Sequence, residues 1–152
     1  MIRILVTLCM TLAVCAGCGE KGTRPSPSAP SNQEQAYIDQ GNARADQGDL
    51  AGAIANYTQA LALNPQNAMA YNNRGNARAD QGDLTGAIAD YTQALTFDPQ
   101  YANAYYNRGG VRATNGDKAG AVTDFRKAAD LYQQQGKTAD YQDTLDHIKE
   151  LR

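Results

Sequence analysis

Cysteine and histidine are the residues of this chain that could ligate a soft metal or act as catalytic nucleophile and base. The sequence of 152 residues has three cysteines and one histidine. Cys9, Cys15 and Cys18 lie near the N-terminus, whereas His147 lies near the C-terminus. Structural zinc sites and Cys–His or Ser–His–Asp nucleophiles need such residues in one constellation. We therefore expect no metal, no cofactor and no catalytic residue.

The N-terminal cysteines favour lipid attachment. Residues 4–16 form an apolar run that is too short for a transmembrane helix of about 20 residues but suits the apolar region of a signal peptide. The run ends in Ala16, Gly17 and Cys18, which resembles the lipobox of bacterial lipoproteins. The resemblance implies that residues 1–17 are a cleaved signal peptide. It also implies that Cys18 carries diacylglycerol and often a third acyl chain, which would anchor the chain firmly in a membrane.

Other interpretations of this N-terminus stay open. Cys15 stands where the lipobox prefers Leu, and lipidation of Cys15 itself would place Val14 beside the cleavage point, so we favour Cys18. Plain secretion and an uncleaved anchor are the alternatives. The resemblance implies a bacterial cell-envelope membrane, with the protein facing the periplasm or the exterior. In some bacterial lipoproteins, an Asp after the lipidated Cys is linked to retention in the inner membrane. This chain has Gly19 at that place, which favours the outer membrane, but the choice between the inner and the outer membrane stays open.

Residues 18–33 predict a lipid-anchored linker. This segment is rich in proline and serine and has almost no apolar side chains. Such a composition cannot bury a core and favours a disordered, partly extended chain. We expect the linker to hold a folded domain away from the membrane.

The rest of the chain is built from a repeated segment. Residues 41–67 and 75–101 have nearly the same sequence at an offset of 34 residues, and a more divergent copy starts at Gly109. The first two copies differ only at the position pairs 51/85, 56/90, 62/96, 63/97, 64/98 and 67/101. Such a period predicts stacked units that each bury an apolar face against the next.

Glycine, alanine and aromatic residues recur at the same places in each unit. The first helix is expected to end at a glycine in a left-handed conformation, and the Asp after it to cap the second helix. Another glycine lies where a Cβ would block a neighbouring helix. The sets are Tyr37/Tyr71/Tyr105, Gly41/Gly75/Gly109, Gly48/Gly82/Gly116, Asp49/Asp83/Asp117, Ala53/Ala87/Ala121, Tyr57/Tyr91/Phe125, Ala60/Ala94/Ala128 and Pro65/Pro99.

This pattern resembles the tetratricopeptide repeat. The resemblance implies an all-α solenoid of three helix-turn-helix repeats, at residues 34–67, 68–101 and 102–135. It also implies structural roles for the recurring residues.

Two sets of polar residues depart from the family pattern. Gln40, Arg74 and Arg108 stand where the family usually has Leu, and residues 44, 78 and 112, where it often has Tyr, are arginines. The first set varies together with Asn56, Asp90 and Asp124. Since Gln occurs with Asn and Arg occurs with Asp, we predict half-buried Arg–Asp pairs in repeats two and three and a neutral amide pair in repeat one.

Residues 136–152 predict a capping helix. The second helix of repeat three lacks the proline and is expected to end at Gly136, after which Thr138 can cap a last helix. Tyr141, Leu145 and Ile148 have the spacing of one apolar helical face. Such a helix hides the final apolar face of a repeat array. We interpret His147 as an inert surface residue.

The first helices of the units are expected to form a concave wall rich in asparagine. An Asn amide both donates and accepts hydrogen bonds, which suits an extended peptide backbone. A solvated wall without a ligand is the alternative. The candidate peptide-binding residues are Ile38, Asn42, Asp46, Asn72, Asn73, Asn76, Asp80, Asn103, Tyr106 and Asn107.

One ligand of the family is not expected here. Chaperone-binding members of the family grip an acidic C-terminal tail with a clamp of Lys, Asn, Asn, Lys and Arg. The corresponding positions are Ile38, Asn42, Asn73, Asn103 and Asn107, so both asparagines are present and all three cations are missing. Without these charges a terminal carboxylate would be held weakly.

The sequence therefore predicts a non-catalytic scaffold that binds a protein or peptide and is tethered to a membrane by lipid. A module that self-associates weakly through the open face of repeat one, or a passive spacer, is the alternative. A nucleic-acid partner is not expected, because the formal net charge is −2 and phosphate binding needs a basic excess. The 16 acidic residues recur mainly at cap or surface positions, which argues against acid–base catalysis.

Overall fold

Seven α-helices make up the part of the chain that the computed structural model describes, residues 32–151. They are α1 (Asn32–Asp46), α2 (Leu50–Leu63), α3 (Ala68–Asp80), α4 (Leu84–Phe97), α5 (Ala102–Thr114), α6 (Lys118–Gln134) and α7 (Thr138–Glu150). The predicted signal peptide, Cys18 and most of the predicted linker lie outside the described residues. Within residues 32–151, no helix combines the length and the apolar character needed to cross a membrane.

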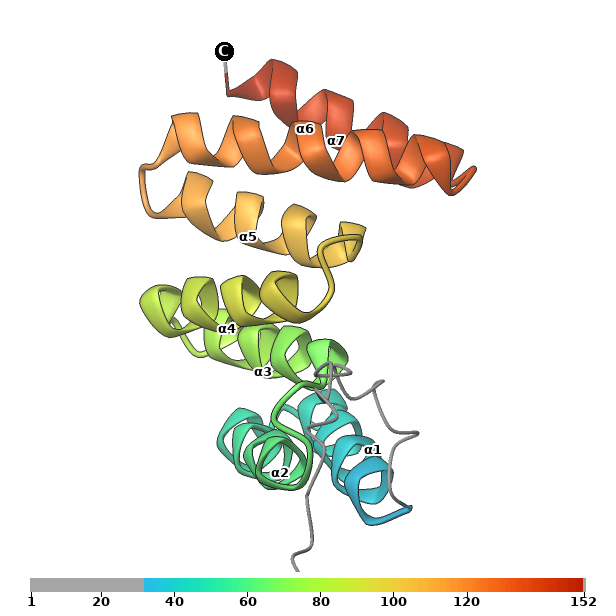
Figure 1. Ribbon diagram of the computed structural model, residues 1–152. Helices are drawn as coiled ribbons and strands as arrows, with labels where there is room; N and C mark the ends of the chain where they lie inside the picture. Colours follow the sequence, from blue (N-terminus) through green and yellow to red (C-terminus); the bar gives the residue numbers. More distant parts are fainter. Residues whose placement is uncertain (1–31, 152) are drawn as a thin grey trace, which may run out of the picture.

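The helices pack as consecutive pairs that stack into a solenoid (Figure 1). The pairs α1–α2, α3–α4 and α5–α6 make the most extensive contacts, and each second helix also packs against the first helix of the next pair. α7 packs on α6 at the far end of the stack. The prediction of an all-α solenoid of three helix-turn-helix repeats with a C-terminal capping helix is confirmed.

Local sequence accounts for the sharp turn inside each pair. Gly48, Gly82 and Gly116 have φ angles of 78°, 89° and 86°, a region that L side chains rarely adopt. The aspartate after each glycine caps the next helix; the Asp49 carboxylate accepts a hydrogen bond of 2.9 Å from the backbone N–H of Gly52. Asp83 and Asp117 make the same contact with Gly86 and Gly120. The predicted glycine ends of α1, α3 and α5 and the predicted Asp caps of α2, α4 and α6 are therefore confirmed.

A second glycine in each repeat lets the two helices of a pair approach closely. A Cβ on Gly41 would lie 2.5 Å from the Tyr57 ring, and one on Gly75 would lie 2.7 Å from the Tyr91 ring. The aromatic rings themselves are almost fully buried. The glycines are thus needed because a large ring from the second helix packs directly onto the backbone of the first.

The capping helix closes the array as the sequence predicts, except at its first residue. Gly136 has a φ of 70° and ends α6, and Ile148 of α7 is buried against Phe125. Thr138, however, is the first residue of α7 and not its cap; Lys137 occupies the N-cap position and makes no side-chain cap bond. The turn glycine sets this start, because Thr138 N–H already bonds to the Gly136 carbonyl.

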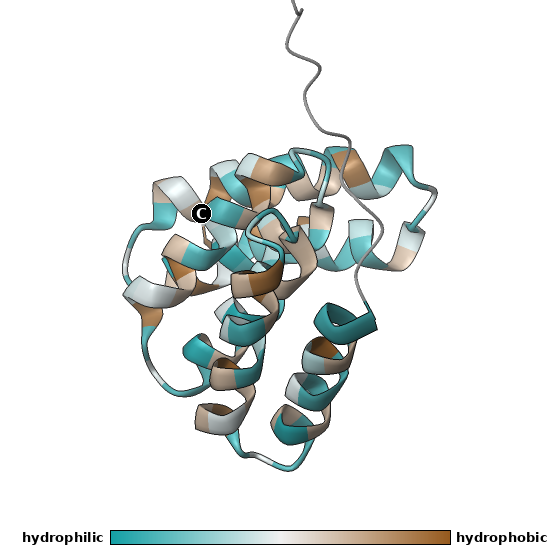
Figure 2. Cartoon of the chain, turned by 60° about the horizontal axis from the view of Figure 1, so that its bottom comes forward, coloured by the Kyte–Doolittle hydropathy of each residue, from teal (hydrophilic) through white to brown (hydrophobic). Residues whose placement is uncertain are grey.

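Apolar and polar residues alternate along the helices, while the loops that join them are mostly hydrophilic (Figure 2). The apolar residues form several small clusters, each between neighbouring helices, instead of one central core. This arrangement is typical of repeat proteins, in which each repeat contacts only its neighbours. Besides the contacts within and between pairs, α3 also contacts α1 and α5, so the first helices of the three pairs lie side by side along the stack.

Candidate functional site

Four adjoining hollows lie along the wall formed by α1, α3 and α5. Their volumes, from α1 toward α7, are about 210, 480, 480 and 380 Å³. Neighbouring hollows share residues, and α7 borders the last two through Asp140, His147 and Glu150. We call this continuous surface the concave groove. The candidate residues that line it are Asn42, Asp46, Asn72, Asn73, Asn76, Asp80, Asn103, Tyr106 and Asn107.

The prediction that Ile38 lines the groove is wrong. Ile38 is fully buried and packs in the cluster that joins α1 to α2, together with Ala53 and Tyr57. Burying a branched apolar side chain of this size contributes about 1.5–3 kcal/mol, which favours the interior over a polar wall. Asn72 and Tyr106 occupy the same register in α3 and α5 and do border the groove.

The groove asparagines bind one another and the core tyrosines. Asn42 Oδ1 accepts hydrogen bonds from the Tyr57 hydroxyl at 2.8 Å and from Asn73 Nδ2 at 3.1 Å. One repeat later, Asn76 Oδ1 accepts from the Tyr91 hydroxyl at 2.8 Å and from Asn107 Nδ2 at 3.0 Å. We call these two units the asparagine ladder. The ladder joins the two helices of one repeat to the first helix of the next.

The ladder leaves the Nδ2 atoms of its two acceptor residues, Asn42 and Asn76, free to bind a ligand, and both residues line the groove. The exposed residues Asn42 and Asn76 use only Oδ1 in these bonds, and among residues 32–151 no hydrogen bond uses their Nδ2 atoms. Asn103 is similar, since its Oδ1 accepts a bond of 2.9 Å from the Tyr132 hydroxyl. Each Oδ1 is held by a tyrosine, so the orientation of the free N–H donor is set before any ligand arrives.

Asn72 is less available than the sequence suggests. Its side chain is only 4 % exposed, donates to Asn73 at 3.3 Å and accepts from Asn107 at 3.1 Å. These bonds satisfy much of its capacity within the protein. Asn72 therefore acts mainly as a support for its two neighbours.

The sequence contains a signal for the ladder that residue-by-residue reasoning missed. Repeats one and two pair a Tyr with an Asn, whereas repeat three has Phe125 and Gly110 at the equivalent positions. Phe125, which has no hydroxyl donor, thus occurs together with Gly110, which has no side-chain acceptor. This exchange is the expected mark of a hydrogen bond between the two positions. A Cβ on Gly110 would meet nothing within 4 Å, so the groove is open there.

Tyr106 connects the groove wall to the capping helix. Its hydroxyl donates to Asp143 Oδ2 at 2.6 Å and lies 3.0 Å from His147 Nε2. Burial and this hydrogen bond to Asp143 raise the pKa of Tyr106. Burial, together with Asp140 and Asp143, raises the pKa of Tyr132 to about 12. His147 also stacks on Phe125 with ring centroids 5.4 Å apart, so it is a packing residue of this end and not simply a surface residue.

Two exposed carboxylates lie in the groove beside the buried tyrosines. Asp46 shares a hollow with Tyr57, and Asp80 shares one with Tyr91. Burial, followed by the negative charge of Asp46, raises the pKa of Tyr57. Both tyrosines therefore stay protonated at neutral pH and keep donating to the asparagine ladder.

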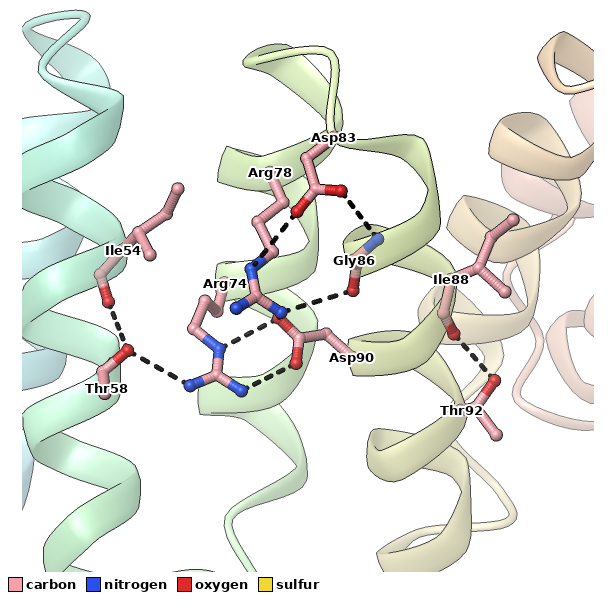
Figure 3. Close-up of polar contacts among 9 residues, drawn as sticks. All are labelled: Ile54, Thr58, Arg74, Arg78, Asp83, Gly86, Ile88, Asp90 and Thr92. Carbon is pink, nitrogen blue, oxygen red and sulfur yellow. Dashed lines mark hydrogen bonds and ion pairs between the residues drawn. The ribbon is translucent and has the colours of Figure 1, made fainter.

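The predicted Arg–Asp pairs of repeats two and three are confirmed. Figure 3 shows the pair of repeat two. Arg74 makes two bonds to Asp90, at 2.9 and 2.7 Å, and Arg78 reaches the same carboxylate at 2.9 Å. Arg74 also donates to Thr58 of the preceding repeat at 3.1 Å. Arg108, Arg112, Asp124 and Thr92 repeat this arrangement. The carboxylates are almost fully buried, so these pairs are structural contacts between helices.

The neutral amide pair predicted for repeat one does not form. Gln40 is exposed, and the Nδ2 atom of the buried Asn56 has no hydrogen-bond partner among residues 32–151. Arg44 turns to Asp49, at 3.5 Å, instead of toward Asn56. A neutral amide attracts a guanidinium less than a carboxylate does, so Arg44 stays near the helix cap.

The comparisons with known proteins agree with this geometry. The family profile described as Tetratricopeptide repeat matches residues 38–102 and 94–136. No match to a curated protein was found.

Several solved structures have a similar fold. The second TPR domain of human RPAP3, in complex with an HSP70 peptide, is 29% identical, with a TM-score of 0.70 over 80% of this chain and 98% of that chain. The TPR domain of Sgt2 from Aspergillus fumigatus is 27% identical, with a TM-score of 0.70 over 80% and 83%. The TPR2B domain of yeast Sti1, in a complex with pHsp70, is 21% identical, with a TM-score of 0.77 over 80% and 97%.

The sequence period, the helix pairs and the family profile give one result, which is that this chain belongs to the tetratricopeptide repeat family.

Proposed function

We propose that this protein is a non-catalytic scaffold that binds an extended peptide segment of a partner in the concave groove. The observation that carries the proposal is the set of oriented Nδ2 donors at Asn42, Asn76 and Asn103. An extended backbone presents carbonyl acceptors that such donors can bind. Donors already held in place by tyrosines lose little side-chain entropy on binding.

Two further observations support peptide binding. The groove is continuous over three repeats, which suits a ligand longer than a small metabolite. The similar domain of human RPAP3 is in complex with the HSP70 peptide SGPTIEEVD, so this fold accepts a peptide in a 29% identical relative.

We also propose that lipid on Cys18 tethers the scaffold to a bacterial envelope membrane. The proposal rests on the apolar run at residues 4–16 and on the small residues before Cys18. A flexible linker would let the groove reach a partner at some distance from the bilayer. Mass spectrometry of the purified N-terminal peptide, and membrane fractionation of Cys18→Ser, test it. A Cys18→Ser protein that stays in the membrane fraction would reject lipidation at this residue as the anchor.

Photo-crosslinking tests the groove directly. A photoreactive residue is placed at Thr114, which is exposed and borders two of the hollows. Gly110→Tyr is then added to fill the open groove next to it, since a side chain at position 110 meets no protein atom nearby. We expect a crosslinked partner in the first protein and its loss in the second.

The matched control carries the photoreactive residue at Ala89. Ala89 is exposed on α4 and lines none of the four hollows. Circular dichroism confirms that each variant is folded. The proposal is rejected if positions 89 and 114 capture the same proteins, or if Gly110→Tyr leaves the adduct at position 114 unchanged.

A further inference from the structure

The concave groove carries an excess of carboxylates. Asp46, Asp80, Asp140 and Glu150 line its hollows, whereas Lys137 is the one Lys or Arg among the residues lining the four hollows. Asp46, Asp80 and Asp140 make no side-chain hydrogen bond or ion pair with any residue between 32 and 151. Their charge is therefore not neutralised within the described fold.

The arginines of α1 and α3 lie on a different side of their helices from the groove carboxylates. Arg78 comes two positions before Asp80, and two positions correspond to a rotation of about 200° around an α-helix. Arg78 binds Asp90 and Asp83, on the side of α3 that faces α4, while Asp80 lies in the groove. The same spacing separates Arg44 from Asp46 in α1. In repeat two the arginines thus bind carboxylates between α3 and α4, while Asp80 lies on the concave wall and makes no ion pair with residues 32–151.

The groove also has surfaces for aliphatic chains and for planar cations. The hollow between α3 and α5 is bordered by the partly exposed side chains of Leu84 and Tyr106, beside the carboxylate of Asp80. Lys and Arg side chains place an apolar stem on such a surface and a charged head beside an acid. A guanidinium also binds favourably over a tyrosine ring.

We propose that the groove selects an extended basic segment, with Lys or Arg side chains that reach Asp46, Asp80 and Asp140 and with backbone carbonyls bound by the asparagine ladder. This inference rests on the proposed function and names the chemistry of its ligand. An acidic tail is disfavoured for the same reason, because its carboxylates would meet unpaired carboxylates in the groove.

Fluorescence anisotropy tests the charge preference. The full chain in non-ionic detergent is titrated into three labelled octapeptides in which Leu alternates with Arg, with Gln or with Glu. We expect the Arg peptide to bind most tightly, the Gln peptide less tightly and the Glu peptide least. Raising the NaCl concentration should weaken binding of the Arg peptide, since exposed charge pairs are screened by salt.

Two variants of equal charge locate the effect. Asp46→Asn/Asp80→Asn removes two groove carboxylates, and the control Asp39→Asn/Asp130→Asn removes two exposed carboxylates that line none of the four hollows. We expect the groove variant to weaken binding of the Arg peptide roughly three- to tenfold, from two partly exposed ion pairs, and the control to change it less than about twofold.

The outcomes separate this inference from the proposed function. Equal affinity for the three peptides, or equal effects of the two double variants, overturns the basic-segment inference. If Gly110→Tyr abolishes binding in that case, the groove still binds peptides, through its amides and without charge selection. If no peptide binds, the basic-segment inference is also overturned, and the crosslinking at Thr114 decides the proposed function independently.

Discussion

Repeats one and two have nearly the same sequence but use different polar contacts to hold their helices. In repeat two, the Asp90 carboxylate binds two arginines, and one of them continues to Thr58 of repeat one. In repeat one, Asn56 replaces the carboxylate and has an unpaired Nδ2 atom. Instead, Glu34 at the start of α1 accepts bonds from Asn64 and Asn67, at 3.0 and 2.5 Å.

The difference follows from the position of each repeat in the array. Arg74 and Arg108 each bridge to a threonine of the preceding repeat. Among the described residues, no helix precedes α1, so an arginine at position 40 would lack that half of the bridge. Glu34 contacts the loop toward repeat two, which lies on the side where a neighbour exists. Within residues 32–151, repeat one is therefore held from one side only. Four predictions test this comparison.

Loss of the shared carboxylate should have the largest effect. We expect Asp90→Ala to lower the free energy of unfolding by about 3 kcal/mol, because it leaves Arg74 and Arg78 without their buried partner. Asn56→Ala, at the same place in repeat one, should cost less than about 1 kcal/mol because its Nδ2 atom has no hydrogen bond to lose. Urea unfolding followed by circular dichroism measures both. Equal losses would show that the two repeats are held alike.

Removal of the end-repeat contact should come next. Glu34 is 2 % exposed and binds two amides of the α2–α3 loop, so we expect Glu34→Ala to cost about 2 kcal/mol. Hydrogen exchange should show the loss mainly in α1 and the α2–α3 loop. Gln33→Ala, at an exposed neighbouring position, is the control. A uniform loss of protection over all helices would contradict a contact local to repeat one.

Transfer of the inner-repeat pair to repeat one should be stabilising. In the double variant Gln40→Arg/Asn56→Asp, we expect an Arg–Asp pair like that of repeat two, with a gain of about 1 kcal/mol. This gain is smaller than the cost of removing the pair in repeat two, because residues 32–39 offer no threonine to complete the bridge. The two single variants complete a double-mutant cycle in urea unfolding. A coupling energy near zero would mean that the pair needs the preceding repeat in order to form.

The smallest effects should come from contacts that the two repeats share. Tyr57 and Tyr91 each donate to a ladder asparagine at 2.8 Å, so Tyr57→Phe and Tyr91→Phe should each cost about 0.5–1 kcal/mol. Thermal unfolding of both variants measures this, and the two values should agree. A clear difference between them would show that the ladder, too, depends on position in the array.

Much of the fold could be predicted because it depends on contacts that are close in sequence. Gly48 and Asp49 end one helix and cap the next through residues at most a few positions away, so their types at a period of 34 residues already specify the helix pairs. The Arg–Asp pairs could also be predicted, since the two positions vary together between repeats.

The site was predicted less well because its contacts depend on how helices rotate and pack. Ile38 and Asn72 have the same register, yet only Asn72 borders the groove. The sequence also contains the joint change from Tyr and Asn in repeats one and two to Phe and Gly in repeat three. This change can be interpreted as a hydrogen bond only once the structure shows that the two side chains are in contact.

The repeat, the number of helix pairs, the turns and the capping helix all follow from the amino-acid sequence, because short-range caps and a strict period leave little choice of fold. Which polar groups of the groove are free to bind a ligand depends instead on how the helices pack. Asn42 and Asn73 lie in different repeats, and only the packing of α1 on α3 brings their amides within 3.1 Å. In that contact Asn42 Oδ1 accepts the hydrogen bond, while Asn42 Nδ2 makes none with residues 32–151. This outcome depends on side-chain direction, which residue type cannot specify.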